Sequence, residues 1–249
     1  VVKALCDMAG VKYDAHYMVT SVDPPELVQF IKEQYPDVSR DIPHDSDGKP
    51  ITMWNTIPKH KTPPTRIARY CCEELKESCS KGRFTVTGVR WAESARRKKN
   101  QGLVTIYEAD KDLRESAAFV VTDKGGVMLN NDNDETRDLV EDCYRQHKTV
   151  INPIIDWTDD DVWEFLHHYG CDANPLYKCG FKRIGCIGCP MAAKKRYTEF
   201  QMYPKYKLNY IKAFDRMLER RLERGLGRGL GSKDEWKTGK DVFKWWMNE

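Results

Sequence analysis

The first 35 residues constrain the fold most, because their apolar pattern changes period twice. VVKALCDMAG (residues 1–10) has the spacing of an amphipathic helix that ends before its glycine, and VKYDAHYMVT (residues 11–20) alternates as a strand does. A second helix is predicted from Pro24, with Asp23 as its N-cap. A helix followed by a strand usually belongs to a βαβ unit, so we expect an earlier strand upstream of this chain.

The loop between this strand and the second helix, TSVDPP (residues 20–25), is the first candidate binding element. In an open α/β sheet, such loops follow the carboxyl ends of the strands and line the ligand crevice. Ser21 and Asp23 are therefore candidate ligand-binding residues.

Three further segments are predicted from their turn residues and periodicity. Residues 40–65 are rich in Pro, Gly and Asp and are expected to form a loop, whereas residues 66–82 are expected to form a helix. A strand from residue 83 runs into WAESARRKKN (residues 91–100), which is expected to be a loop.

The second half of the chain carries clearer signals. Residues 118–129 predict a β-hairpin with two glycines in its turn, and a helix is expected to begin after Thr158, its N-cap. The C-terminal third is predicted to be helical, with GLGRGLG (residues 225–231) as a flexible link before a final amphipathic segment.

A CxxC turn is the strongest chemical signal. Cys186 and Cys189 lie in GCIGCP, where the small glycines leave the backbone room to fold around a metal ion or cluster. The adjacent Cys71 and Cys72 could supply two further sulfurs, and a four-iron cluster suits this pair better than the smaller Zn²⁺. A zinc site, a redox dithiol and chance remain alternatives, and Cys179 could replace one of the pair.

The cysteine count indicates the compartment. The chain has nine cysteines, an odd number, and no secretory signal, so we expect a reducing, cytoplasmic environment. No apolar run approaches the roughly 20 residues of a membrane span, so no membrane partner is expected.

Anion-binding side chains are concentrated in TGVRWAESARR (residues 87–97). Glycine allows close backbone approach, and arginine can bind phosphate or sulfate through two parallel hydrogen bonds. The alternative is a charged surface loop. The candidates there are Gly88, Arg90, Glu93 and Ser94, and Arg66, Arg69 and Arg183 lie near the cysteine motifs.

Charge is distributed unevenly between the two ends of the chain. Residues 190–249 have a net charge of +7, against −4 for residues 1–189. Such asymmetry is typical of a polyanion-binding protein, although a solvated helix face gives the same pattern.

The motifs together resemble the phosphoadenosine phosphosulfate (PAPS) reductase family of the PP-loop ATP pyrophosphatase superfamily. The matching segments occur in family order over most of residues 1–190 and include TSVDPPELVQFI, MWNTIPKHKTPPTRIARYCCEELKE, TGVRWAESARR, INPIIDWTDDDVWEFL and NPLYKCGFKRIGCIGCP. The resemblance implies an α/β fold with a parallel sheet that binds an adenine nucleotide, in a domain at 1–190. A basic, aromatic helical extension is expected at 191–249.

The cysteine pattern is similar to that of the adenylylsulfate-reducing branch, which implies that Cys71, Cys72, Cys186 and Cys189 hold a [4Fe–4S] cluster. The family's substrate-binding arginines would correspond to Arg90, Arg69 and Arg183. ATP or adenylylsulfate would lie near Ser21, Asp23 and Gly88. None of the six histidines is assigned as a general base.

Two departures from the family bear on function. The PP-loop is absent and would lie just upstream of Val1, and the tail lacks the family's catalytic cysteine, since the last cysteine is Cys189. The first hypothesis is therefore ATP-dependent sulfur transfer to a small molecule or to a nucleic acid (DNA or tRNA), with a cysteine desulfurase as sulfur-donating partner. The alternatives are a sulfonucleotide reductase that uses a partner's thiol, and a non-catalytic component of a larger assembly.

Overall fold

The computed structural model describes residues 1–77, 84–107, 109–123, 125–130, 148–229 and 236–248. They belong to two compact units. The sheet unit comprises residues 1–13 and 79–173, and the helical unit comprises residues 14–78 and 174–249.

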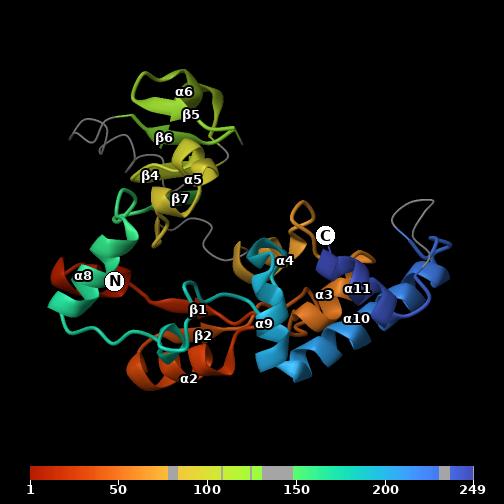
Figure 1. The fold of residues 1–249 in the computed structure, drawn as a ribbon. Coiled ribbons are helices and arrows are strands. Elements are labelled where there is room, and N and C mark those ends of the chain that lie inside the picture. Colours follow the sequence, from red (N-terminus) through yellow and green to blue (C-terminus); the bar gives the residue numbers. More distant parts are fainter. Residues whose placement is uncertain (78–83, 108, 124, 131–147, 230–235, 249) are drawn as a thin grey trace. The chain divides into compact units, whose positions relative to one another are not determined.

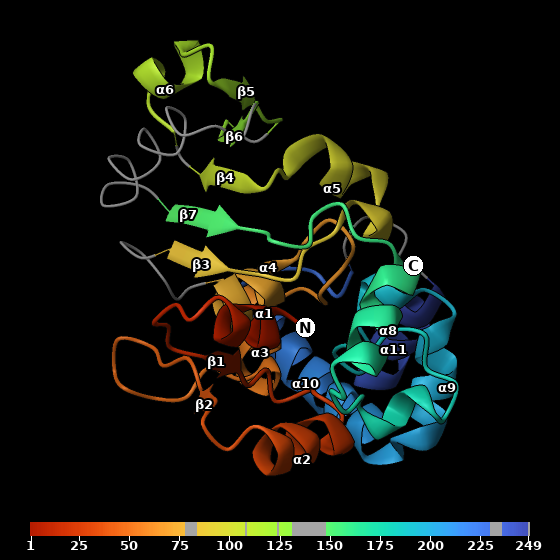
Figure 2. The same cartoon turned by 90° about the vertical axis from the view of Figure 1, so that its left-hand side faces the viewer.

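The sheet unit contains a five-stranded sheet with the order β3-β7-β4-β6-β5 (Figure 2). Its strands are β3 (Phe84–Val86), β4 (Val104–Tyr107), β5 (Phe119–Val121), β6 (Val127–Leu129) and β7 (Lys148–Ile151). Strands β3 and β7 pair in parallel, and the other three pairs are antiparallel. Apolar side chains of β4 and β6, among them the fully buried Ile106 and Val127, form the core of this unit.

Short helices accompany the sheet. They are α1 (Val2–Met8), the 3-10 turn η2 (Trp91–Glu93), α5 (Ala95–Asn100), α6 (Lys111–Glu115) and α8 (Asp159–His168). Helix α8 begins with a capping box, in which the Thr158 hydroxyl accepts from the Asp161 amide and the Asp161 carboxylate accepts from the Thr158 amide.

The helical unit contains a parallel strand pair and most of the long helices (Figure 1). Strands β1 (His16–Met18) and β2 (Ser39–Asp41) flank α2 (Pro25–Gln34) in sequence. The other elements are α3 (Met53–His60), α4 (Tyr70–Cys72), the π-helix η1 (Glu73–Glu77), the 3-10 turns η3 (Pro175–Tyr177) and η4 (Pro190–Ala192), α9 (Lys195–Met202), α10 (Pro204–Glu223) and α11 (Gly239–Asn248).

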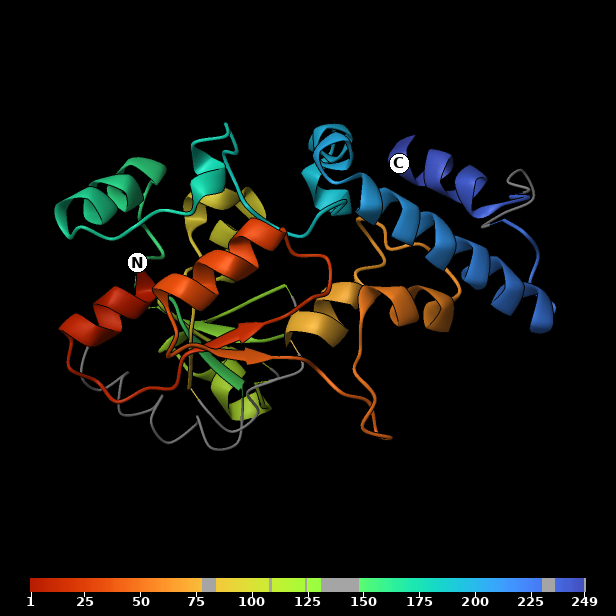
Figure 3. The same cartoon turned by 90° about the horizontal axis from the view of Figure 1, so that it is seen from below.

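Helix α10 is the axis around which this unit packs. Helices α3 and α11 both lie along it, as Figure 3 shows from below. The core between them is aromatic, and its fully buried side chains include Tyr210, Phe214 and Trp246. The Trp246 indole also donates to the Pro64 carbonyl at 2.6 Å, which ties α11 to the segment before α4.

Several sequence predictions are confirmed. The first helix, the strand after it and the second helix are present as α1, β1 and α2. The predicted N-cap of the second helix, Asp23, is wrong, because Pro24 is the residue that precedes α2. The hairpin at 118–129 is formed by β5 and β6, and Thr158 caps α8 as expected. The α/β class holds, and the parallel pairs β1–β2 and β3–β7 are accompanied by an antiparallel extension of the larger sheet.

Two predicted loops are wrong in part. Residues 40–65 contain helix α3, because Thr52 and Asn55 form a capping box that begins the helix despite the proline content. Residues 91–100 contain η2 and α5, and the Ser94 side chain caps α5. The helix expected at 66–82 is present as α4 and η1, and its last five residues lie outside the described part of the chain.

The predicted break at 225–231 is confirmed for the part that is described, since α10 ends at Glu223 and residues 225–229 form no helix or strand. The flexibility of this segment stays a prediction. The buried Arg221 guanidinium donates to the carbonyls of Gly227 and Gly229 at 2.8 and 2.5 Å, and also to Lys61. The carbonyl oxygens of Gly227 and Gly229 therefore both contact the Arg221 guanidinium. In the helical unit, the described residues after Pro190 pack with earlier parts of that unit. The boundary expected near residue 190 stays a prediction.

Candidate functional site

Hydrogen bonds made by the backbone of the CxxC loop hold this loop to three other segments. The Ile187 amide donates to the Val22 carbonyl at 2.8 Å, and the Tyr210 hydroxyl donates to the Ile187 carbonyl at 2.9 Å. The Gly188 amide donates to the Glu199 carboxylate at 2.8 Å. These contacts fix the loop against the segment after β1 and against α9 and α10.

Gly188 is required by both space and conformation. Its φ is +76°, and a β-carbon there would lie 2.5 Å from Cζ of Phe200 and 3.1 Å from the Trp246 ring. By contrast, a β-carbon on Gly185 would meet no atom within 4 Å. The aromatic core thus presses directly on the turn between the two cysteines, so this turn cannot expand inwards.

The two cysteine motifs come together within the helical unit. Cys71 and Cys72 lie on α4, and all four thiols are half-buried. The pKa of Cys71 is raised, first by its hydrogen bond with Cys72 and by burial, and further by the nearby thiols of Cys72, Cys189 and Cys186. Cys71 and Cys186 also pack against the same hydrophobic core, so the two motifs lie in one region of the helical unit.

Two cations lie beside these thiols. Arg69 donates from Nη2 to the Cys72 sulfur at 3.3 Å. The pKa of Cys72 is lowered to about 5 by its hydrogen bond with Cys71 and by Arg69. Burial lowers the pKa of Lys76, but attraction to Cys186, a hydrogen bond with Cys186 and attraction to Asp23 and Cys72 together outweigh burial, so the pKa of Lys76 is raised. The sequence reasoning missed Lys76, although its place four residues after Cys72 puts it about one helical turn away.

The loop after β1 reaches the same region. The Thr20 hydroxyl lies 3.6 Å from the Cys186 sulfur, and its amide donates to the buried Asp23 carboxylate at 2.8 Å. Ser21 has a φ of +64°, and its hydroxyl accepts from the Met53 amide at 3.0 Å. Asp23 and Ser21 therefore shape this loop through their own hydrogen bonds. Thr20, which sequence reasoning did not single out, is therefore the loop residue that contacts a cysteine.

Burial perturbs two further groups next to the cysteines. The pKa of Cys189 is raised, chiefly by burial. Burial also raises the pKa of Glu199, and the Gly188 amide offsets part of this rise. Among the described residues, no group of three or more His, Cys, Asp or Glu side chains is placed to hold a metal ion. The four thiols predicted from the sequence remain the candidate ligand set.

The other predicted anion-binding residues lie in the sheet unit, and three of them have structural partners. Arg90 donates to the Trp157 carbonyl at 3.3 Å and pairs with Asp159 at 2.6 Å, which secures the start of α8. Glu93 pairs with Arg97 at 2.6 Å, and Ser94 caps α5. Gly88 has room for a β-carbon, whose nearest contact would be at 3.4 Å.

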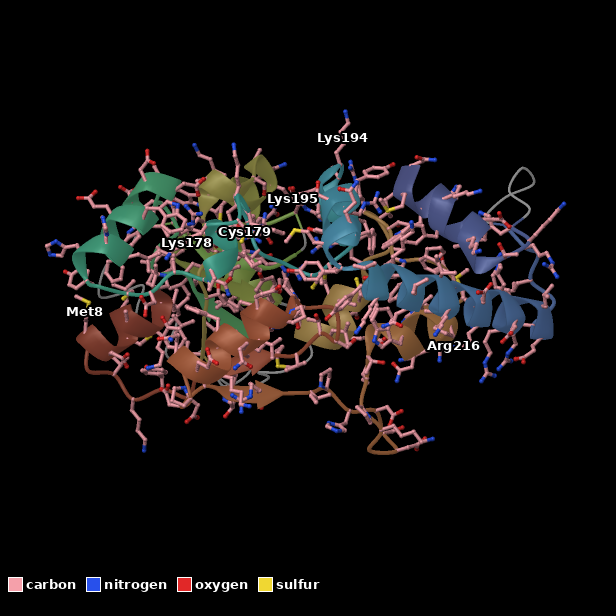
Figure 4. The ribbon with its side chains drawn as sticks, turned by 60° about the horizontal axis from the view of Figure 1, so that its bottom comes forward. Met8, Lys178, Cys179, Lys194, Lys195 and Arg216 are labelled. Atoms are coloured by element: carbon pink, nitrogen blue, oxygen red, sulfur yellow. The ribbon has the colours of Figure 1, made fainter. Side chains whose placement is uncertain are left out.

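The remaining candidates surround the CxxC loop. Arg66 donates to the Pro190 carbonyl at 3.4 Å, so it secures the far side of this loop. Arg183 is exposed, and its carbonyl accepts from Lys195 at 2.8 Å. Cys179, labelled in Figure 4, is exposed and follows the last residue of η3 by two positions.

Fold and site together define an α/β protein in which four cysteines and two cations meet beside the end of a parallel strand. A family model for the phosphoadenosine phosphosulfate reductase domain matches residues 8–192. The chain therefore belongs to the PAPS reductase family of the PP-loop superfamily.

Individual relatives match smaller parts of the chain. An uncharacterised 37.8 kDa protein of Escherichia phage 186 is 32% identical over 156 residues, 62% of this chain and 38% of the relative. An uncharacterised protein of Methanocaldococcus jannaschii is 29% identical over 161 residues, 61% of this chain and 30% of the relative. The adenosine 5′-phosphosulfate reductase of Allochromatium vinosum is 43% identical over 42 residues, 17% of this chain and 16% of the reductase.

The chain spans well under half the length of each of these relatives. The described helices include none that is long and apolar enough to cross a membrane.

Proposed function

We propose that this chain is an iron–sulfur enzyme that binds an adenine nucleotide and transfers sulfur in an ATP-dependent reaction to a nucleic acid or a small molecule. The observation that supports it most is the convergence of four thiols with Arg69 and Lys76 beside the loop that follows β1. The reducing interior of the cytoplasm, where thiols stay free, suits such a protein.

Cys71, Cys72, Cys186 and Cys189 would hold a [4Fe–4S] cluster, since four thiolates are the usual ligands of such a group. Two features of the chain support this fit. The other three thiols raise the pKa of Cys71, and Phe200 leaves no room for a β-carbon at Gly188, in the turn between Cys186 and Cys189. When bound, the cluster would either polarise the substrate sulfur or carry it. Zn²⁺ is the competing occupant.

The protein's own groups have clear electrostatic roles in this proposal. Arg69 stabilises negative charge at Cys72, and Lys76 does so at Cys186. Cations next to thiolates offset the repulsion among four negative sulfurs. Thr20 orients its hydroxyl toward Cys186, and the buried Asp23 fixes the backbone from which Thr20 projects.

ATP or adenylylsulfate is the proposed nucleotide. The loop at Ser21 and Asp23 would supply backbone contacts, because both side chains are already engaged in shaping the loop. Arg69 and Arg183 would bind the anionic groups. Gly88, Arg90, Glu93 and Ser94 belong to the sheet unit, where their anion-binding role stays a prediction from the sequence. Arg90 would have to leave Asp159 before it could bind an oxyanion.

A second candidate function is sulfonucleotide reduction to sulfite. It is favoured by the partial matches to proteins named adenosine 5′-phosphosulfate and phosphoadenosine 5′-phosphosulfate reductase. In this reaction a thiol from a partner protein would attack the sulfur of the nucleotide, and a second thiol would release sulfite by forming a disulfide.

Parallel assays separate the two functions. One contains ATP, a cysteine desulfurase with radiolabelled cysteine, and nucleic acid, and the other contains adenylylsulfate with a dithiol protein. The first function predicts label in nucleic acid and AMP or pyrophosphate formation, both lost in Cys186→Ser and kept in Cys179→Ser. Sulfite from the second mixture, with no label transferred in the first, would favour the reductase. Inactivity in both, with nucleotide binding retained, would contradict both enzymatic functions.

A further inference from the structure

A basic groove lies between the end of α3 and the C-terminal half of α10. Its lining residues are Asn55, Pro58, Lys59, Lys61, Arg216, Glu219, Arg220, Glu223 and Arg224. Five of the nine are cationic and two are acidic, so the groove has a net charge of +3. It lies entirely within the helical unit and outside the cysteine site.

Arg216, Arg220 and Arg224 follow one another at four-residue intervals, which places them on one face of the α10 helix and its final residue. Such an interval advances about 6 Å along a helix, so the row extends over about 12 Å. A nucleic acid strand presents one phosphate per about 3.4 Å of duplex axis, so this row could face three or four phosphates. Lys59 and Lys61 at the end of α3 supply the opposite wall. Figure 4 shows Arg216 on this helix.

The arginines are positioned by contacts that leave the groove cationic. Arg216 donates to the Trp54 carbonyl at 2.9 Å, a neutral partner, so its charge is retained. Arg220 contacts Glu223 at 3.2 Å, but both side chains are about 60% exposed or more, and an exposed pair of this kind exchanges readily for a phosphate partner.

We propose that this groove binds the phosphodiester backbone of a nucleic acid strand. The proposal rests on the proposed function, for which it selects nucleic acid as the substrate class. A repeated anion along a line matches the row of arginines better than one compact anion would. None of the nine lining residues is aromatic, so the groove contacts backbone phosphates and does not stack on bases.

Helix α3 connects this groove to the cysteine site. Its first residue, Met53, donates its amide to Ser21 in the loop beside the cysteines. In its last turn, Lys59 contacts Glu74 at 2.9 Å, two residues beyond Cys72. A strand held along α10 and the end of α3 is therefore bound by the same compact unit that carries the proposed sulfur-handling residues.

The test is equilibrium binding of a fluorescent single-stranded oligonucleotide to the protein, measured by anisotropy over a range of salt concentrations. The groove variant is Arg220→Gln with Arg224→Gln, and the matched control is Lys205→Gln with Lys212→Gln on the same helix but outside the groove. Both double variants lose the same charge, and Arg216 is left in place because it supports α3.

We expect the groove variant to bind about tenfold more weakly or worse at moderate salt. The slope of log K against log salt should fall in magnitude by about 1.4, because each lost phosphate contact to a single strand removes about 0.7. The control should keep a slope close to that of the unmodified protein. Equal losses in the two variants, or displacement of the oligonucleotide by polyglutamate at matched charge, would overturn the proposal.

Measuring iron content and ATP binding in the same variants distinguishes a failure of the groove proposal from a failure of the proposed function. Both should be unchanged in the groove variant, since its residues lie outside the site. If the cluster and nucleotide are absent from the unmodified protein while the groove effect is observed, the proposed function fails and the groove remains.

Discussion

Arg216 of α10 donates from its guanidinium to the backbone carbonyl of Trp54 in α3, at 2.9 Å. This carbonyl would normally accept from the amide four residues later, which is Pro58 and has no N–H. Arg216 therefore supplies from another helix the hydrogen bond that the proline removes. The contact joins α3, which borders the cysteine site, to the axis of the helical unit.

Because Arg216 donates the hydrogen bond that Pro58 cannot, the effects of mutating Arg216 and Pro58 on the free energy of unfolding should be coupled. Arg216→Met should cost about 1 kcal/mol, because the Trp54 carbonyl loses its partner. In a Pro58→Ala background the restored amide satisfies that carbonyl, so the same change should cost close to nothing. Urea unfolding of the four proteins measures the coupling, with Arg220→Met as the neighbouring control. Equal costs in both backgrounds would show that the contact contributes independently of the proline.

Gly188→Ala should destabilise the helical unit and loosen the CxxC turn. The added carbon would overlap the Phe200 ring, and alanine disfavours a φ of +76°. We expect a loss of about 1–3 kcal/mol, as for other overpacked core positions. Gly185→Ala is the matched control, since its β-carbon meets no neighbour and its φ is not positive. Equal thermal stabilities of the two variants would contradict this packing.

The capping box of α8 predicts a pH-dependent contribution to stability. Hydrogen bonds from the amide and then from the hydroxyl of Thr158 lower the pKa of Asp161 below its ordinary value of 3.8. A lowered folded-state pKa stabilises the folded state above the ordinary value, and this contribution disappears as pH falls through the folded-state pKa. Asp161→Asn should therefore be less stable than the unmodified protein at neutral pH, with the difference narrowing in acid.

Asp160→Asn is the control for this change, because it removes a neighbouring first-turn charge and leaves the box intact. Chemical unfolding at neutral pH and in acid, at constant salt, provides the comparison. A stability difference for Asp161→Asn that stays constant across this range would show that the carboxylate charge has no part in the cap.

How much the sequence could predict depended on whether the signal was local. Helix α8 was predicted correctly because Thr158 and Asp161 begin it through contacts within one turn. Helix α3 was missed because Pro58 lies inside it and the compensating donor, Arg216, is about 160 residues away in sequence. Local sequence likewise could not show that the Arg221 side chain donates to the carbonyls of Gly227 and Gly229.

The same distinction between local and distant contacts applies to the candidate site. The spacing of Cys186 and Cys189 predicted half of a ligand set, and the resemblance to the PAPS reductase family implied that Cys71 and Cys72 complete it. The structure places the four thiols near one another. Local sequence could not show that Arg90, Glu93 and Ser94 already have structural partners. Local sequence also could not show that Thr20 contacts Cys186, because the two loops are joined by a backbone hydrogen bond between Ile187 and Val22, which are far apart in sequence.

We propose one iron–sulfur cluster for this chain, held by Cys71, Cys72, Cys186 and Cys189. The most direct test of this proposal is iron, sulfide and zinc analysis of the protein purified without oxygen, beside single Cys→Ser variants at these four positions and at Cys179. We predict about four irons and four sulfides per chain, lost from each of the four variants and retained in Cys179→Ser. One zinc per chain without sulfide, or loss of iron on changing Cys179 but not Cys71, would contradict the assignment.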